Sequence, residues 1–173
     1  MSKRRKNDFY PTPKWATEVL LKYIDIDNKH ILEPCVGNGD ISNVLSNHTL
    51  NLITNDIDET RLAHTYEDAT KEDLFKNNII DWTITNPPFS HALPIVQNAW
   101  KYSEYGVAML LRLSFLEPTY DRQDWLHYNP PHKIIVLPRI SFTGDGKTDS
   151  VTCAWFIWYK KNIDLGIYVE RKE

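Results

Sequence analysis

Apolar positions along the chain alternate between helical spacing and short continuous runs. Helical spacing predicts amphipathic helices at four segments: Pro13–Ile26, with Thr12 as its cap, Asp40–Ser46, Glu59–Tyr66 and His91–Tyr102. The continuous runs predict buried strands at His30–Leu32, Leu50–Thr54, Trp82–Thr85 and Val107–Leu113. This alternation indicates an α/β fold, with a mostly parallel twisted sheet and helices on both faces.

The alternation changes after Leu113. The segment Glu117–His132 is polar, aromatic and proline-containing, which predicts a long loop or a short irregular insertion. Ile134–Leu137 and Val151–Tyr159 predict two strands that close the sheet as an antiparallel hairpin, joined through the turn at Gly144–Gly146. With 173 residues, the chain has room for one core, so we expect a single domain over residues 1–173, with a flexible basic tail at residues 1–8.

Composition narrows the classes of protein that the chain can belong to. Hydrophobic residues make up 42% and charged residues 25%, as in globular domains, and the net charge of -3 lacks the basic bias of a dedicated nucleic-acid-binding domain. Cys35 and Cys153 lack metal-type spacing, so we expect no metal site, no disulfide framework and a cytoplasmic location. No apolar run approaches the roughly 20 residues of a membrane span.

The first polar cluster follows the run His30–Leu32. Glu33 ends this predicted strand, and Gly37 and Gly39 allow a tight turn beside a ligand. The spacing differs from the dinucleotide pattern G-x-G-x-x-G, and an acid here would repel a phosphate and attract an ammonium group. The cluster fits the amino acid end of S-adenosylmethionine, and a plain Gly-x-Gly turn is an equally good explanation.

The second cluster, Asp56 and Asp58, follows the run Leu50–Thr54. A carboxylate at the end of a parallel strand can accept hydrogen bonds from ribose hydroxyls, and we expect Asp56 to do so, with Ile57 against an adenine ring. Asp58 is better explained as the cap of the predicted helix after it.

The third cluster, Asn86-Pro87-Pro88-Phe89, directly follows Trp82–Thr85. An aromatic amine is a poor nucleophile because its lone pair is delocalised into the ring. Hydrogen bonds from its two N–H groups to the Asn86 side-chain oxygen and the Pro87 carbonyl would favour a pyramidal nitrogen that faces a methylsulfonium. The prolines stiffen this loop, and Phe89 offers a face for stacking on a planar base.

Together and in this order, the clusters resemble the amino-methyltransferase family: DNA adenine-N6 and cytosine-N4 enzymes and their RNA and protein-glutamine relatives. The motif order is similar to the gamma arrangement, and the resemblance covers Phe9–Tyr159. It implies a Rossmann-like class I methyltransferase fold, S-adenosylmethionine as cofactor and Asn86–Phe89 as the catalytic segment. The residues that it implies around the cofactor are Tyr10, Thr12, Pro13, Glu33, Cys35, Gly37, Gly39, Asp56, Ile57 and Asp68, with Asp73 as the alternative to Asp68.

The chain departs from the family pattern in two ways. Phe89 stands where many members have tyrosine, which keeps the stacking face and loses a hydroxyl. Few residues follow Tyr159, where gamma-type enzymes carry a target-recognition domain. Without such a domain, we expect the protein to prefer single-stranded substrates or to need a protein partner. The segment Glu117–His132 could also recognise the target, because its aromatic residues and Arg122 could contact bases and phosphate. The alternative for this segment is an ordinary packed loop.

The triplet Asn129-Pro130-Pro131 within it follows no predicted strand and is expected to be a loop.

The resemblance therefore implies methyl transfer from S-adenosylmethionine to an exocyclic amino group, with N6 of adenine in DNA favoured. RNA adenine and protein glutamine are the alternative substrates, and a phage or restriction-modification setting is the family-level expectation. A non-catalytic subunit that binds cofactor or nucleic acid is the alternative from a different class.

Overall fold

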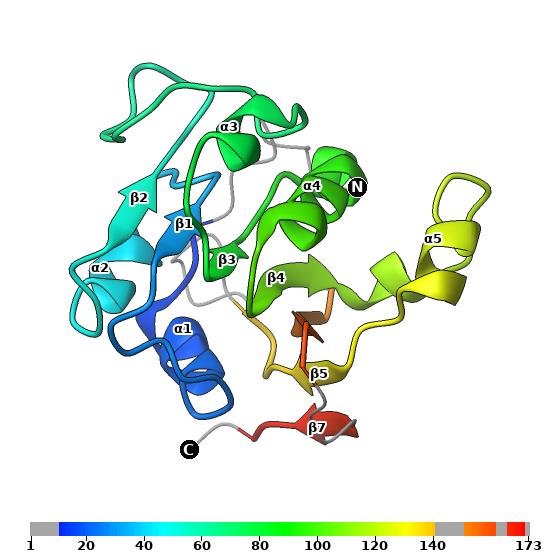
Figure 1. Ribbon diagram of the computed structural model, residues 1–173. Coiled ribbons are helices and arrows are strands. Elements are labelled where there is room, and N and C mark those ends of the chain that lie inside the picture. Colours follow the sequence, from blue (N-terminus) through cyan, green and yellow to red (C-terminus); the bar gives the residue numbers. More distant parts are fainter. Residues whose placement is uncertain (1–10, 141–150, 162–165, 172–173) are drawn as a thin grey trace.

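A seven-stranded sheet forms the centre of the computed structural model (Figure 1), which describes residues 11–140, 151–161 and 166–171. Its strands are β1 (Ile31–Glu33), β2 (Leu52–Thr54), β3 (Trp82–Thr85), β4 (Gly106–Arg112), β5 (Lys133–Val136), β6 (Cys153–Tyr159) and β7 (Gly166–Val169). The order across the sheet is β2-β1-β3-β4-β6-β5-β7. Among the described strands, β6 alone runs antiparallel to its neighbours, so the predicted parallel sheet and closing hairpin are confirmed.

Helices cover both faces of the sheet. On one face lie α1 (Lys14–Leu20) and α2 (Ser42–Leu45), whose Leu20 and Leu45 are fully buried in one apolar cluster with Ile84 of β3. On the other face lie α3 (Asp73–Lys76) and α4 (Ala92–Tyr102), whose Leu74 and Val96 are fully buried in a second cluster. None of the helices that the structure describes has the length and apolar character of a membrane span.

Strand β6 supplies much of the centre of both clusters. All seven of its residues are buried, and its side chains alternate between the two faces, as the pleat of a strand requires. Trp155 lies in the first cluster, where its indole N–H donates to the carbonyl of Ala16 of α1 (2.7 Å). Trp158 lies in the second and donates to the carbonyl of Asn129 (3.0 Å). The predicted loop at 129–131 thus has a packing role.

Several elements differ from the prediction. The opening helix ends at Leu20, and Thr12 does not cap it: Pro13 holds the N-cap position, without a side-chain capping bond. The segment 117–132 is partly helical, since it contains α5 (Gln123–Tyr128). This helix projects beyond the end of β4 (Figure 1). The apolar pattern predicts neither α3 nor β7, which are both only four residues long. The predicted turn at 144–146 lies outside the described residues.

The helix predicted at Glu59–Tyr66 is wrong. Residues 56–70 form turns and extended chain. Asp58 Oδ1 accepts the backbone N–H of Thr60 (3.0 Å), so Asp58 closes a turn and does not cap a helix. His64 Nδ1 accepts the backbone N–H of Thr54 (3.0 Å), which draws the segment back to β2. These tertiary hydrogen bonds outweigh the local helical spacing.

Asn55 organises this segment from inside the protein. It follows β2 and is completely buried. Its Nδ2 donates to the carbonyl oxygens of Pro34 (3.0 Å) and Glu67 (2.9 Å). Its Oδ1 accepts the backbone N–H of Glu67 (2.8 Å) and the hydroxyl of Thr65 (2.9 Å). One side chain therefore ties the loop after β1 to the end of β2 and to the chain that leads into α3.

We expect Asn55→Ala to lower the free energy of unfolding by about 2–4 kcal/mol, because it leaves several buried polar groups without a partner. Denaturant unfolding would measure the loss. Asn47→Ala is the matched control, since Asn47 is exposed and its amide donates to the carbonyls of Asn43 and Val44. Equal stability losses in the two variants would contradict the organising role of Asn55.

Candidate functional site

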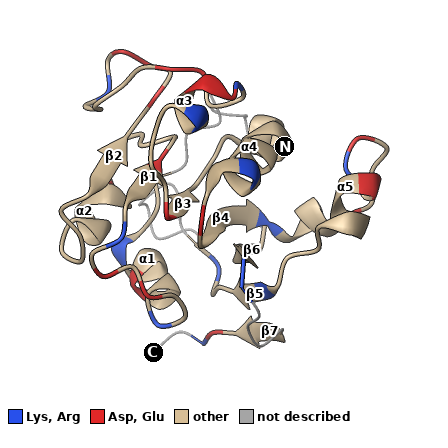
Figure 2. Ribbon diagram, in the orientation of Figure 1, with Lys and Arg blue, Asp and Glu red and all other residues tan. Residues whose placement is uncertain are grey.

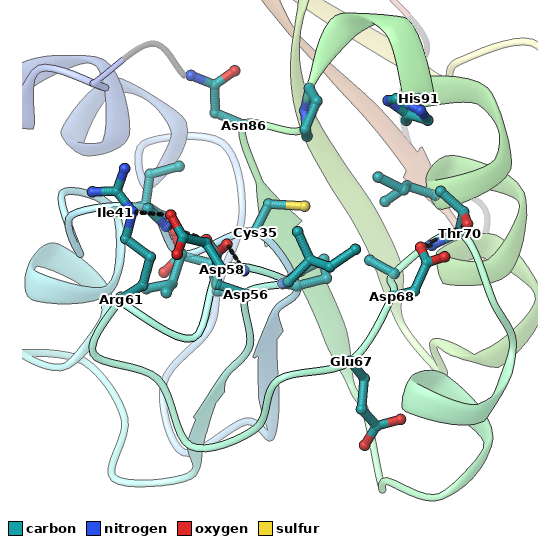
Figure 3. A pocket seen from close by; sticks show the side chains of 18 of the residues that line it. Cys35, Ile41, Asp56, Asp58, Arg61, Glu67, Asp68, Thr70, Asn86 and His91 are labelled. Atoms are coloured by element: carbon teal, nitrogen blue, oxygen red, sulfur yellow. Dashed lines mark hydrogen bonds and ion pairs between the residues drawn. The ribbon is translucent and has the colours of Figure 1, made fainter. Parts of the chain in front are cut away.

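A cavity of about 570 Å³ lies at the carboxyl ends of β1, β2 and β3. Strand β1 pairs with β2 on one side and β3 on the other, so the loops after β1 and β3 diverge at this point. A divergence of this kind in a parallel sheet is where ligands bind in open α/β folds. In Figure 3, Asp56, Asp58 and Arg61 face Asp68 and Thr70 across the cavity, and Asn86 and His91 lie above them.

Nine of the residues that the sequence suggests for the site line this cavity. They are Thr12, Glu33, Cys35, Gly37, Asp56, Ile57, Asp68, Asn86 and Pro88. Four others, Pro13, Gly39, Pro87 and Phe89, belong to the same loops but are not among its lining residues. Tyr10 lies outside the described residues.

The loop after β1 turns through two glycines with left-handed backbone. Gly37 has φ 55° and Gly39 has φ 83°, a region that side chains with a Cβ rarely adopt. The N–H of Gly37 donates to Asp56 Oδ2 (2.8 Å), and the N–H of Asp58 donates to Asp56 Oδ1 (2.9 Å). Asp56 therefore joins the loop after β1 to the loop after β2, and each of its oxygens keeps further acceptor capacity toward the cavity.

Glu33 lies at the base of the cavity with 1% of its surface exposed. Its Oε2 has no hydrogen-bond partner among the described residues. Burial raises the pKa of this carboxyl well above its ordinary value, although hydrogen bonds from Ser42 act in the opposite direction. Burial also raises the pKa of Asp40, which lines the same cavity. A buried carboxylate oxygen without a donor is a strong acceptor for a ligand cation.

The cavity as a whole is acidic. Six carboxyl side chains line it, and Arg61 is the sole Lys or Arg among its lining residues: the acids are Glu33, Asp40, Asp56, Asp58, Glu67 and Asp68. Arg61 is held by Asn38 Oδ1 (2.5 Å) and Asp58 Oδ2 (3.5 Å). Such a lining favours a cationic ligand and disfavours phosphate groups.

Asp68 lies on the far side of the cavity from Asp56 (Figure 3). Its Oδ1 accepts the hydroxyl (2.7 Å) and the backbone N–H (2.9 Å) of Thr70, and the hydroxyl contact is the main reason why the pKa of Asp68 is lowered. The carboxyl is therefore ionised at neutral pH. Asp73, its alternative in the sequence, begins α3 and is not a lining residue.

Asn86 follows β3 directly and faces the cavity. Its Nδ2 donates to Thr12 Oγ1 (3.1 Å), so the segment before α1 orients the amide, with the nitrogen toward Thr12 and the oxygen on the opposite side. Farther along this loop, the guanidinium carbon of Arg112 lies 4.6 Å from the centre of the Phe89 ring. A cation thus already covers one face of the aromatic ring.

Sequence reasoning missed several lining residues. The main ones are Asp40, Arg61, Thr70, Ser90 and His91. Asp40 comes directly after Gly39, and Ser90 and His91 come directly after Phe89. Their closeness in sequence to the motifs is therefore a signal from which they could be predicted as lining residues. Arg61 and Thr70 come from a segment whose path depends on Asn55, which no local pattern reveals. No group of three or more potential metal ligands occurs within the described ranges.

Neither a family model nor a curated protein sequence matches the chain, but solved structures do. A candidate RNA methyltransferase from Pyrococcus horikoshii matches with a TM-score of 0.69 at 19% identity, over 91% of this chain and 90% of its own. A candidate class I S-adenosylmethionine-dependent methyltransferase from Listeria monocytogenes matches at 0.58 and 13% identity, over 90% of this chain and 61% of its own. A chain of a type I R-M system matches at 0.68 and 14% identity, over 97% of this chain and 45% of its own. The chain therefore has the class I methyltransferase fold.

Proposed function

We propose that the protein transfers a methyl group from S-adenosylmethionine to an exocyclic amino group, with N6 of adenine in DNA as the favoured target. The observation that carries this proposal is an acid-lined cavity that ends at the Asn86 loop. S-adenosylmethionine carries an ammonium, a sulfonium and one carboxylate and no phosphate, so its net positive charge complements this lining. A dinucleotide would be repelled by it.

The lining residues fit the parts of this cofactor. Glu33, with its unpartnered oxygen, and Asp40 would hold the ammonium group. Asp56 would accept hydrogen bonds from the ribose hydroxyls, while Ile57 and Asp68 would contact the adenine. When bound, the cofactor supplies an electrophilic methyl group on sulfur.

The loop after β3 would bind and orient the substrate amine. The Asn86 oxygen and the Pro87 carbonyl would accept the two N–H groups of the substrate amine, which favours a pyramidal nitrogen with an available lone pair. Thr12 holds the Asn86 amide in the orientation that this requires. The substrate nitrogen loses its proton after attack, so the step needs no strong base.

The choice of substrate rests on the neighbours and on the resemblance in the motifs. The candidate RNA methyltransferase and the type I R-M system among the structural matches support a nucleic acid. RNA adenine and protein glutamine are the alternatives, because their N–H groups could use the same acceptors, and a protein partner could supply target recognition. A non-catalytic subunit would have no use for the oriented Asn86 amide.

Asn86→Ala is expected to lower kcat by about 100-fold or more, because it removes an acceptor aimed at the reacting nitrogen, while the dissociation constant for S-adenosylmethionine stays the same. Calorimetry and single-turnover transfer would measure the two quantities. Asn129→Ala is the matched control, because it alters the other Asn-Pro-Pro triplet, and it should retain transfer. Full activity of Asn86→Ala would remove this residue from the mechanism.

Glu33→Gln tests the ammonium site through its pH dependence. Because the folded-state pKa of Glu33 is raised, the ligand-free protein should lose stability as pH rises above the ordinary carboxyl pKa toward the raised value. Cofactor affinity should increase over the same window, since the cation binds the ionised carboxylate.

The Gln variant should melt higher than wild type at neutral pH without ligand and bind the cofactor at least about tenfold more weakly. Both pH dependences should become smaller, with a remainder from Asp40, whose pKa is also raised by burial. Thermal melting and calorimetry across the window measure these effects. Glu18→Gln, an exposed acid paired with Lys14, is the control. Unchanged affinity in Glu33→Gln would place the ammonium group elsewhere.

The substrate class is tested by transfer of a labelled methyl group to unmethylated DNA, total RNA and protein extract in parallel. We expect N6-methyladenine in DNA, and more product from single strands than from matched duplex, because a paired base costs a few kcal/mol to extrude. Label confined to RNA or protein would contradict the DNA target. A clear duplex preference would contradict the single-strand expectation.

A further inference from the structure

A second cavity, of about 230 Å³, lies beside the loop that follows β3 and carries Asn86. Its lining residues are Phe89, Ser90, Ala92, Leu111, Arg112, Ser114, Phe115 and Arg122. Ser90 lines both cavities, so they approach each other at the loop that carries Asn86. A substrate group that reaches Asn86 therefore has a neighbouring pocket for the atoms attached to it.

The two cavities have opposite charge. The first is lined by six carboxyl groups, whereas the lining residues of the second include two guanidinium groups and no carboxyl group. In Figure 2, the end of β4, where Arg112 lies, is blue, while acidic residues mark the segment that leads into α3. Asp121 precedes Arg122 in sequence, but its carboxylate accepts the hydroxyl of Thr119 (2.5 Å) and is not part of the lining.

Both arginines are held in place by the fold. Arg112 ends β4 and lies over the Phe89 ring. Arg122 donates from Nη2 to the carbonyl of Ser114 (3.1 Å) and from Nε to the carbonyl of Glu117 (3.2 Å), and its guanidinium lies 5.2 Å from the centre of the Phe115 ring. Carbonyl oxygens do not cancel a positive charge, and Asp121, which interacts electrostatically with Arg122, lies outside the lining of the cavity. Arg122 therefore presents a charge to the cavity, and little of its side-chain entropy remains to be lost on binding.

We propose that this second cavity binds a phosphodiester group of a polynucleotide substrate, beside the nucleotide whose base reaches Asn86, and that Arg112 and Arg122 are its positioning residues. Guanidinium groups match phosphate oxygens in geometry as well as charge. A polynucleotide carries a phosphate next to every base, so this contact would form whatever the sequence, whereas a glutamine side chain has no anion at a fixed distance. The identity of the methylated base rests on the function proposed above, and the anion site does not.

The test uses the full chain with S-adenosylhomocysteine bound, so that no methyl transfer takes place, and labelled single-stranded DNA and RNA oligonucleotides in separate arms. We expect Arg112→Gln and Arg122→Gln each to weaken binding about tenfold and to reduce the slope of log K against log salt by about 0.7, the contribution of one phosphate contact on a single strand. Lys22→Gln, an exposed cation beyond the end of α1, should change neither quantity. The arm with the larger loss identifies DNA or RNA as the ligand.

Arg112→Lys separates charge from packing. It should keep the wild-type salt slope and lose part of the affinity, because a lysine retains the charge without the planar fork. If Arg112→Lys loses as much salt dependence as Arg112→Gln, or if both Gln variants bind oligonucleotides with wild-type affinity and slope, the phosphate site is overturned. Wild-type affinity for S-adenosylhomocysteine and a cooperative melting transition confirm that each variant is folded.

Failure of the two proposals can be told apart. If wild type methylates nucleic acid but the arginine variants keep the wild-type salt slope, the phosphate site alone fails. If the variants lose salt-dependent binding while wild type transfers no methyl group to any pool, the phosphate site stands and the transfer function fails.

Discussion

The site depends on the hydrogen bonds of one buried amide, that of Asn55. Three loops converge on the cavity. The strands that carry them are short, with three residues each in β1 and β2, so the strands alone do not fix the positions of the loops. The Asn55 side chain satisfies backbone groups after β1 and before α3 while its own backbone extends β2. Because a buried amide can satisfy donors and acceptors at once, it fixes the relative position of Glu33, Asp56 and Asp68.

Groups of opposite charge lie on the two sides of the loop from Asn86 to Ser90. On one side lies a cavity rich in carboxyl groups, and on the other a smaller one with two guanidinium groups. The net charge of -3 is the sum over both regions, so composition alone reveals neither the acidic cavity nor the basic one. A cationic cofactor and a polyanionic substrate would each meet a complementary surface, and each would be repelled from the other's cavity.

Much of this could be predicted from the sequence. The strand Trp82–Thr85 matches β3 residue for residue, because Asn-Pro-Pro ends it abruptly, and the motif acids after β1 and β2 do line one cavity. The failures are places where distant contacts decide the structure. The segment 59–66 has helical spacing and yet follows hydrogen bonds to β2 and Asn55, and β7 is defined by its pairing with β5. The second cavity joins Phe89, Arg112 and Arg122, which no spacing rule connects.

The central position of β6 has a kinetic consequence. This strand is inserted between β4 and β5. Its Trp155 and Tyr159 donate to the carbonyl oxygens of Ala16 and Tyr23, so its contacts span some of the largest separations in the chain. Strand β4 ends at Arg112 and β6 begins at Cys153, so β4 is synthesised before its partner. Strand β4, almost entirely apolar, then presents an unpaired edge that is open to intermolecular pairing until its partner arrives. Because pairing between distant segments is slow to form, the same strand that completes the core also prolongs the exposure of the β4 edge.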